Sequence, residues 1–190
     1  MKAWTEKRFG DVATFVKGAS YASADYCSAD EGSIFVTIKC IAKNGGFKRE
    51  GIKYFKGHYT DDQRLGSTDL IFANTDLTRA GDIVGAPLLL PELGSSDVTM
   101  SMDLTKVVVN ETLASKNFVY FYLLTDPVRR FMKDHSSGST VLHLQTKAVP
   151  DLKIAFPESL PEQAKIAEVL STVDRAIEQT EALIAKQQRI

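Results

Sequence analysis

The chain has 190 residues, of which 44% are hydrophobic, enough for one ordinary domain with its own core plus an extension. This composition excludes a disordered chain, and the longest apolar run is too short to cross a membrane. The formal net charge of −1 excludes binding to nucleic acid through bulk positive charge, so any DNA contact depends on local charge separation.

The N-terminal segment and the cysteines indicate the compartment. Residues 1–8 lack the apolar core of a signal peptide. Cys27 and Cys40 are too few for a disulfide scaffold and do not have the spacing of a metal site. We therefore expect a cytoplasmic protein that holds no metal and contacts no membrane.

Short runs of β-branched or aromatic residues, each bounded by Gly, Asp, Asn or Pro, predict strands. These runs are residues 12–16, 34–38, 70–73, 83–90, 106–109 and 152–156. Long polar loops connect them, and the longest, residues 39–63, contains the Gly45-Gly46 turn. No repeat of domain size is present, so these strands are expected to form one domain.

Two short helices are expected between the last two strands. Residues 115–125 form the first, and Asp126 is expected to cap the second, with Pro127 in its first position. The apolar faces of the two helices are expected to comprise Phe118, Phe121 and Tyr122, and Val128, Phe131 and Met132, respectively.

Charge is distributed unevenly along the chain. Residues 39–64 hold seven basic and three acidic residues, whereas residues 80–103 hold four acidic residues and no Lys or Arg. Aromatic residues alternate with the basic ones, namely Phe47, Tyr54, Phe55 and Tyr59. Such a loop suits phosphate contact combined with base stacking or groove insertion, or it is an ordinary solvated loop. This feature alone leaves both interpretations open.

Motifs for catalysis are missing from the sequence. No Gly-rich phosphate loop precedes a helix, and the Asp/Asn-Pro-Pro-Tyr/Phe tetrapeptide of adenine methyltransferases does not occur. Ser137-Gly138-Ser139 lacks the Gly-x-Ser-x-Gly pattern of a nucleophile elbow. His58, His135 and His143 are scattered, and a lone His is usually an ordinary hydrogen-bonding residue. We therefore expect a binding protein without a cofactor, not an enzyme.

The last thirty residues predict one long amphipathic helix. Ser159 is expected to cap it, Glu162 to complete a capping box, and Pro161 to lie in the first turn. At ~1.5 Å per residue, the uninterrupted segment would be about 43 Å long. Apolar side chains at heptad spacing form a seam that has to meet another helix. The seam comprises Ile166, Leu170, Val173, Ile177 and Ile184, with the polar residues Thr180 and Gln187 in the same register.

Together these elements predict an α+β fold. A mixed α/β domain is expected over residues 1–158, followed by a coiled-coil-like helical arm over residues 159–190. The composition changes at Phe156-Pro157-Glu158, which marks the boundary. One core can close within the first segment without help from the seam.

Four segments spread over nearly the whole chain form a family pattern. They are Trp4…Phe9-Gly10-Asp11-Val12…Lys17-Gly18, Asp69-Leu70-Ile71-Phe72-Ala73-Asn74-Thr75-Asp76, Ser137-Gly138-Ser139-Thr140-Val141, and Ile154-Ala155-Phe156-Pro157…Leu160-Pro161-Glu162-Gln163-Ala164-Lys165-Ile166-Ala167. This pattern resembles the specificity subunits of type I restriction–modification systems. The last segment, which resembles the entry into the family's spacer helix, is the most specific.

The resemblance implies recognition of a bipartite site on double-stranded DNA and docking of modification and restriction subunits. It implies no catalysis in this chain. Family members usually carry two recognition domains and two spacer helices, whereas this chain has one of each. We therefore expect either a truncated chain or a half-size subunit that works as a homodimer through its C-terminal helix.

Loops of the domain are expected to enter the major groove, where each base pair presents a distinct pattern of donors and acceptors. The expected DNA contacts lie on the basic loop, on the segment after the third strand and on the Gly-Ser-Thr turn. They are Lys43, Lys48, Arg49, Lys53, Asn74, Thr75, Arg79, Ser139 and Thr140.

A second interpretation is a protein–protein adaptor whose helix dimerises and whose globular part binds protein without DNA. The basic, aromatic loop and the family resemblance favour DNA recognition. Salt dependence distinguishes the two, because a DNA reader releases counterions from phosphates and an adaptor does not.

Overall fold

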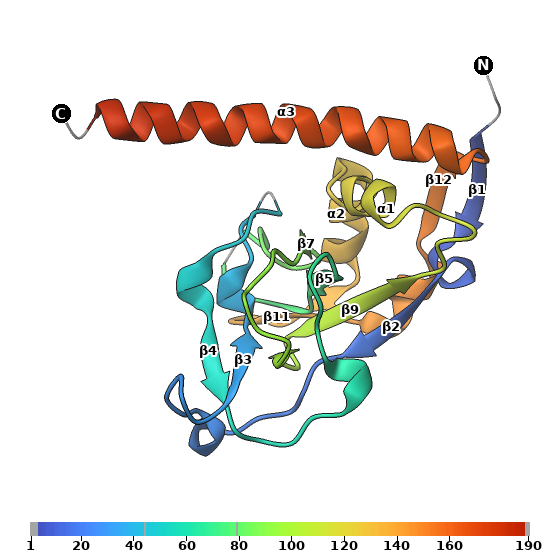
Figure 1. The fold of residues 1–190 in the computed structure, drawn as a ribbon. Coiled ribbons are helices and arrows are strands. Elements are labelled where there is room, and N and C mark those ends of the chain that lie inside the picture. The colour runs from blue at the N-terminus through green and yellow to red at the C-terminus, as the bar shows by residue number, and fades with distance from the viewer. Residues whose placement is uncertain (1–3, 44, 79, 189–190) are drawn as a thin grey trace.

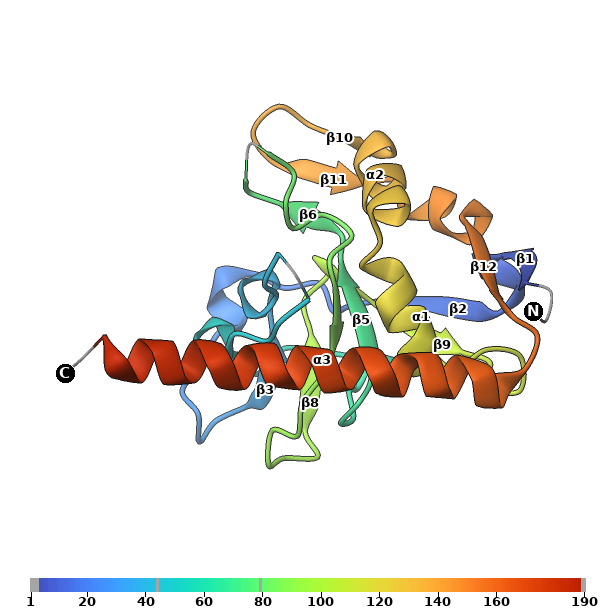
Figure 2. The same cartoon turned by 90° about the horizontal axis from the view of Figure 1, so that it is seen from above.

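The computed structural model describes residues 4–43, 45–78 and 80–188. A mixed α/β domain lies below one long helix, α3 (Leu160–Gln187), which crosses the domain and extends past it (Figure 1). Seen from above, the helix passes over strands β3 and β8 (Figure 2). The predicted α+β fold with a long C-terminal helix is confirmed.

The main sheet is antiparallel, with the strand order β2-β9-β5-β7. Its strands are β2 (Ala13–Lys17), β9 (Leu104–Val109), β5 (Leu70–Ala73) and β7 (Pro87–Leu89). In β5 the side chains alternate between two core clusters: Leu70 and Phe72 belong to the first, Ile71 and Ala73 to the second. Burial on both faces explains why this strand is apolar at every position.

The predicted strand over residues 83–90 is correct only for its second half. The N–H groups of Ile83 and Val84 donate to the Asp76 carboxylate at 2.5 and 2.9 Å. Gly85 then adopts a φ of +69°, which favours glycine. Because these groups are not available to a strand ladder, residues 83–86 turn, and β7 begins at Pro87.

Three smaller sheets surround the main one. Their orders are β4-β3-β8, β10-β11-β6 and β1-β12. Their strands are β1 (Trp4–Arg8), β3 (Ser33–Val36), β4 (Lys53–Phe55), β6 (Thr75–Asp76), β8 (Val98–Met100), β10 (Ser136–Ser137), β11 (Leu142–Leu144) and β12 (Lys153–Pro157). Short 3₁₀ helices connect them at Phe9–Asp11, Ser23–Asp25, Ile38–Cys40, Arg49–Gly51, Asp61–Gln63 and Thr146–Asp151. The pairing of β1 with β12 holds the N-terminal strand beside the segment that leads into α3.

Helices α1 (Lys116–Leu123) and α2 (Asp126–Asp134) lie between the main sheet and α3 (Figure 1). Thr125, not Asp126, occupies the N-cap position of α2, so the predicted cap is displaced by one residue, although Pro127 lies in the first turn as expected. Phe118 is 4% exposed, and Tyr122 is partly buried against the first core cluster.

The first turn of α3 differs from the predicted capping box. Ser159 occupies the N-cap position, but its side chain makes no capping hydrogen bond. Its backbone carbonyl instead accepts from the N–H groups of Glu162 and Gln163, both at 3.0 Å. Gln163 is fully buried, so the beginning of this helix belongs to the packed domain.

Candidate nucleic-acid interface

Ordered backbone holds the basic loop between β3 and β4. The Thr37 hydroxyl accepts from the N–H of Lys39 at 3.2 Å and donates to the carbonyl of Gly51 at 2.9 Å. A Cβ on Gly51 would lie 2.3 Å from the backbone of Lys39, so only glycine fits this close approach. Two further backbone hydrogen bonds of 2.8 Å close the tip of the loop. The cations exposed on this loop are Lys39, Lys43, Lys48, Arg49 and Lys53.

Aromatic side chains in this loop and in the segment that follows it pack into the folded domain. Phe55 is 1% exposed and stacks on Phe35, with ring centroids 4.4 Å apart. Phe47 packs against the second core cluster, and the Tyr59 hydroxyl donates to Asp97. The Phe55 ring lies in the interior and is therefore not available for base stacking or groove insertion.

Strand pairing brings the Thr75 segment next to the Gly-Ser-Thr turn. β11 pairs with β6 and places His143 opposite Thr75, while residues 138–141 form the turn between β10 and β11. Ser139 and Thr140 are exposed on this turn. The predicted contact Arg79 lies outside the described residues.

Asn74 and Thr75 are only 5% and 8% exposed, and both are hydrogen-bonded internally. The Asn74 amide donates to the carbonyl of Met102 at 3.2 Å and accepts from the Thr105 hydroxyl at 2.8 Å. Thr75 donates to the Asp103 carboxylate at 3.2 Å. In this arrangement both side chains support their neighbours, and a direct DNA contact by either one stays a prediction.

Three adjoining hollows join these segments into one surface. The first, of about 650 Å³, contains Lys39 and Lys53; the second, of about 370 Å³, shares Lys39 with the first; and the third, of about 540 Å³, shares Lys43 with the second. We call this continuous area the basic surface. Its cations are Lys39, Lys43, Lys48, Lys53, Arg129, Arg130 and Lys133.

Helix α2 contributes basic residues that were not among the predicted DNA contacts. Arg129, Arg130 and Lys133 line the third hollow beside Lys43. The signal available in the sequence was the polar side of α2, on which residues three and four apart are neighbours. Nothing in the sequence placed that side next to a loop more than eighty residues earlier.

Few of these charges are neutralised within the chain. The Lys43 ammonium lies 2.5 Å from the Asp82 carboxylate. Burial lowers the pKa of Arg129, whose guanidinium donates to the Asp82 carbonyl at 2.7 Å, but an Arg side chain stays protonated. No carboxylate of the described residues lies within 4.0 Å of the side-chain nitrogens of Lys39, Lys48, Lys53, Arg130 or Lys133. These five cations therefore form no ion pair with the described residues, although the same hollows also contain Glu50, Asp76, Asp82, Asp103 and Asp126.

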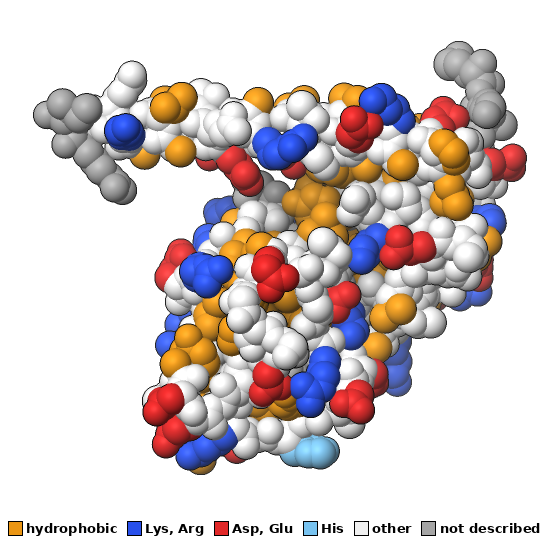
Figure 3. All heavy atoms as spheres, in the orientation of Figure 1, with side chains coloured by type: hydrophobic (Ala, Val, Ile, Leu, Met, Phe, Trp, Pro, Cys, Tyr) orange, Lys and Arg blue, Asp and Glu red, His pale blue; other side chains and the backbone are white. Residues whose placement is uncertain are grey.

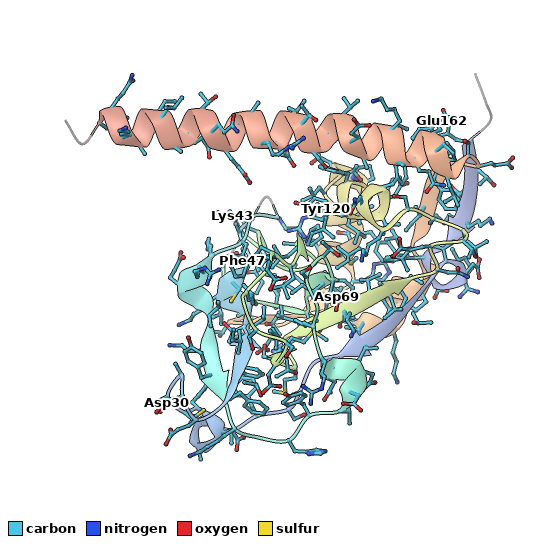
Figure 4. The ribbon with its side chains drawn as sticks, viewed as in Figure 1. Asp30, Lys43, Phe47, Asp69, Tyr120 and Glu162 are labelled. Atoms are coloured by element: carbon cyan, nitrogen blue, oxygen red, sulfur yellow. The ribbon has the colours of Figure 1, made fainter. Side chains whose placement is uncertain are left out.

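The apolar seam of α3 faces partly toward the domain. Ile166 packs against the first core cluster, so the exposed part of the seam begins at Leu170. Below it lies a hollow of about 540 Å³ that also contains Phe47 and Tyr120 (Figures 3 and 4). The helix lines this hollow with Leu170, Val173, Asp174, Ile177, Glu178 and Glu181. Ile184 lies beyond it and is 49% exposed.

The described residues contain neither a candidate metal site nor a candidate membrane-spanning helix. No group of three or more His, Cys, Asp or Glu side chains in the described ranges could hold a metal ion. Among the described helices, none combines the length and the apolar character needed to cross a membrane.

Comparison with known proteins identifies the family. Residues 1–187 match the family model described as the type I restriction modification DNA specificity domain. The chain therefore belongs to this family, whose members are the specificity subunits of type I restriction–modification systems.

Individual relatives agree with this assignment. The chain is 29% identical over 93 residues to the specificity subunit of the type I restriction enzyme MjaIX of Methanocaldococcus jannaschii, covering 49% of this chain and 21% of that protein. The crystal structure of the S subunit of the type I system from M. genitalium superposes with a TM-score of 0.68 at 15% identity, covering 100% of this chain and 44% of that one. The HsdS subunit of Thermoanaerobacter tengcongensis gives a TM-score of 0.65 at 18% identity, covering 98% and 46%. The chain thus spans less than half the length of these relatives.

Proposed function

We propose that this chain is the DNA-reading unit of a cytoplasmic type I restriction–modification complex, in which it directs modification and restriction subunits to a bipartite site. The observation that carries the proposal is the basic surface, where loop 39–53 and α2 meet around the Thr75 segment. The cations of this surface that form no ion pair among the described residues suit the phosphates of a duplex, and phosphate contacts fix the register at which loops reach base edges. We assign no catalytic step to the chain.

The helical arm would set the distance between two recognition domains in the complex. We propose that residues 1–158 form the recognition domain and that residues 159–190 form a spacer helix that pairs with a second such helix. Leu170, Val173 and Ile177 are 39–51% exposed, so burying what remains exposed of each yields up to about half of the roughly 1.5–3 kcal/mol that a fully exposed side chain would give, before association entropy is subtracted. At about 43 Å the arm exceeds one helical turn of DNA, roughly 34–36 Å. Two recognition domains held by paired arms would therefore reach half-sites about one turn apart.

The experiment that tests this proposal measures DNA binding by the complex assembled with its modification subunits, at several salt concentrations. Wild-type complex is expected to bind duplex DNA with a steep salt dependence. The double variant Lys48→Ala with Arg49→Ala should bind more weakly, and each lost phosphate contact should reduce the logarithmic salt slope by about one.

The charge-matched control is Lys17→Ala with Lys147→Ala. Both lysines are exposed and line a different hollow, beside β2 and the Thr146–Asp151 helix. This variant should retain wild-type affinity. Binding of the wild-type complex to its protein partners with no salt-dependent DNA affinity would favour the adaptor interpretation and would overturn the proposal.

A further inference from the structure

An acidic side chain lies inside the largest hollow of the basic surface. Asp103 lines this 650 Å³ hollow together with the two lysines, Lys39 and Lys53. Tyr21 and Thr75 stand beside it, and residue Val141 connects it to the Gly-Ser-Thr turn. The hollow therefore combines a carboxylate, aromatic rings and ammonium groups at the place where the predicted DNA-contacting segments converge.

Neutral hydroxyl groups hold the Asp103 carboxylate in place. Its Oδ2 accepts from the Tyr21 hydroxyl at 3.1 Å and from the Ser101 hydroxyl at 3.4 Å, and its Oδ1 accepts from Thr75 at 3.2 Å. A carboxylate offers about four acceptor sites, so these three donors leave one unused. No Lys, Arg or His of the described residues lies within 4.0 Å of it. Asp103 is thus oriented and incompletely paired.

Tyr21 is suited to remain a donor to this carboxylate. Burial raises the pKa of Tyr21, and its hydrogen bond with Tyr26 and the charge of Asp103 raise it further. The phenol therefore stays protonated at neutral pH. On the other side, Thr75 is held by β6, whose pairing with β11 fixes its position.

The chemistry of DNA restricts what this acceptor can contact. Phosphates and deoxyribose within a duplex carry only acceptor atoms, and a phosphate would be repelled by the carboxylate. The donors that a major groove offers are the exocyclic amino groups, N4 of cytosine and N6 of adenine. A carboxylate on a surface that faces a duplex gains a favourable partner only by meeting one of them.

We propose that Asp103 is a specificity-determining residue that accepts a hydrogen bond from the exocyclic amino group of one cytosine or adenine in the recognised half-site. The inference rests on the proposed function. Lys39 and Lys53 would contact the flanking phosphates, while Tyr21 and Thr75 are positioning residues that fix the carboxylate.

The test compares binding of the complete complex to a library of duplexes with a randomised half-site. Asp103→Ala removes both acceptor oxygens, whereas Asn would keep one acceptor and could still pair with adenine. Discrimination at one base pair should fall about 5- to 150-fold, while preferences at the other positions persist. Tyr21→Phe should weaken discrimination at the same base pair and at no other. The control is Asp97→Ala, which removes an equal charge from a carboxylate outside the hollow that accepts from two hydroxyl groups and also pairs with Arg64.

A second experiment alters the DNA instead of the protein. Duplexes in which single bases lack their exocyclic amino group should bind wild-type complex more weakly at one position only. The Asp103→Ala complex, which has no acceptor at this position, should be insensitive to that same change.

The outcomes separate this inference from the proposed function. Failure of the wild-type complex to select any DNA sequence would overturn the proposed function itself. If wild type selects a sequence and Asp103→Ala keeps the same selectivity, Asp103 reads no base. An equal loss of affinity for all sequences, with a lower melting temperature, would assign Asp103 a purely structural role. Loss of the modification subunit with unchanged selectivity would assign the hollow to a protein contact.

Discussion

The Gln163 side-chain carbonyl accepts a hydrogen bond from the backbone N–H of Ser115 at 2.7 Å, which joins the first turn of α3 to the residue that precedes α1. The same side chain donates through its Nε2 to the carbonyl of Pro157 at 2.8 Å. Gln163 is fully buried. It therefore fixes the direction in which the arm leaves the domain, and it explains a glutamine at this position in the Pro-Glu-Gln segment.

Replacing Gln163 by Ala should destabilise the protein by about 2–5 kcal/mol. The change leaves the partly buried Ser115 N–H and the buried Pro157 carbonyl without these partners, and an unsatisfied buried group costs about 1–3 kcal/mol, less where water reaches it. Urea unfolding measures the effect. Gln179→Ala, an exposed position on the same helix, should stay within about 0.5 kcal/mol of wild type. Equal stability of the two variants would contradict the role given to Gln163.

Asp76 should make the stability of the domain depend on acid pH. Burial alone would raise the pKa of this carboxyl, but the N–H and hydroxyl groups of Thr78 and the N–H groups of Val84 and Ile83 hold it below its ordinary value. Because the folded pKa is lower than the unfolded value near 3.9, the stabilisation is complete above that value and is lost as pH falls through the folded pKa.

Asp76→Asn should therefore be less stable than wild type at pH 7, and the difference should shrink below about pH 4. Thermal unfolding across pH 2–7 provides the measurement. Asp134→Asn, at an exposed position near the end of α2, serves as the control. A difference between Asp76→Asn and wild type that is constant over this range would show that charge is not the cause.

Arg130→Ala combined with Lys133→Ala should weaken DNA binding by the assembled complex. Both residues lie on the basic surface, and both are exposed, so stability should change by no more than about 0.5 kcal/mol each. If each contacts one phosphate, the logarithmic salt slope should fall by about two. Wild-type affinity and slope in this variant would restrict the interface to the loop.

Leu170→Asp combined with Ile177→Asp should abolish pairing of the arm, because it would bury two carboxylates in an apolar seam. Sedimentation velocity and capture of the modification subunit report the result. The control pair, Arg175→Asp with Ala182→Asp, lies on the opposite side of the helix by heptad position. Unchanged assembly in both assays would exclude the seam as the contact.

In-frame deletion of residues 176–182 should shorten the distance between half-sites. One heptad is about 10 Å of helix, which corresponds to roughly 3 base pairs at ~3.4 Å each. The seam keeps its phase, and the packed first turns of α3 are untouched. Mapping of methylated sites should then reveal a shorter spacer with the same half-site sequences. Replacement of the seven residues by another heptad of equal length should preserve the spacer, and an unchanged spacer in the deletion would contradict the arm as a ruler.

Local sequence patterns were sufficient to predict the class of fold and the long C-terminal helix. The heptad spacing from Ile166 to Ile184 predicts a helix without reference to the rest of the chain, and the structure contains it. Strands such as β5 were predictable because an apolar run bounded by polar residues is a local signal. By contrast, β6 and β10 have two residues each, too few for any periodicity. β10 forms a local hairpin with β11, whereas β6 exists only because it pairs with β11, which is distant from it in sequence.

The candidate interface was decided by where residues from distant segments lie in the folded chain. The sequence alone determined that this chain has a basic loop, a Gly-Ser-Thr turn and an arm, since charge, turn chemistry and heptad spacing are properties of short segments. Only the tertiary structure placed Arg130 and Lys133 beside Lys43, turned Asn74 inward and put Asp103 in a hollow between lysines. Long-range strand pairing and core packing bring these residues together, and both depend on contacts between segments far apart in the chain.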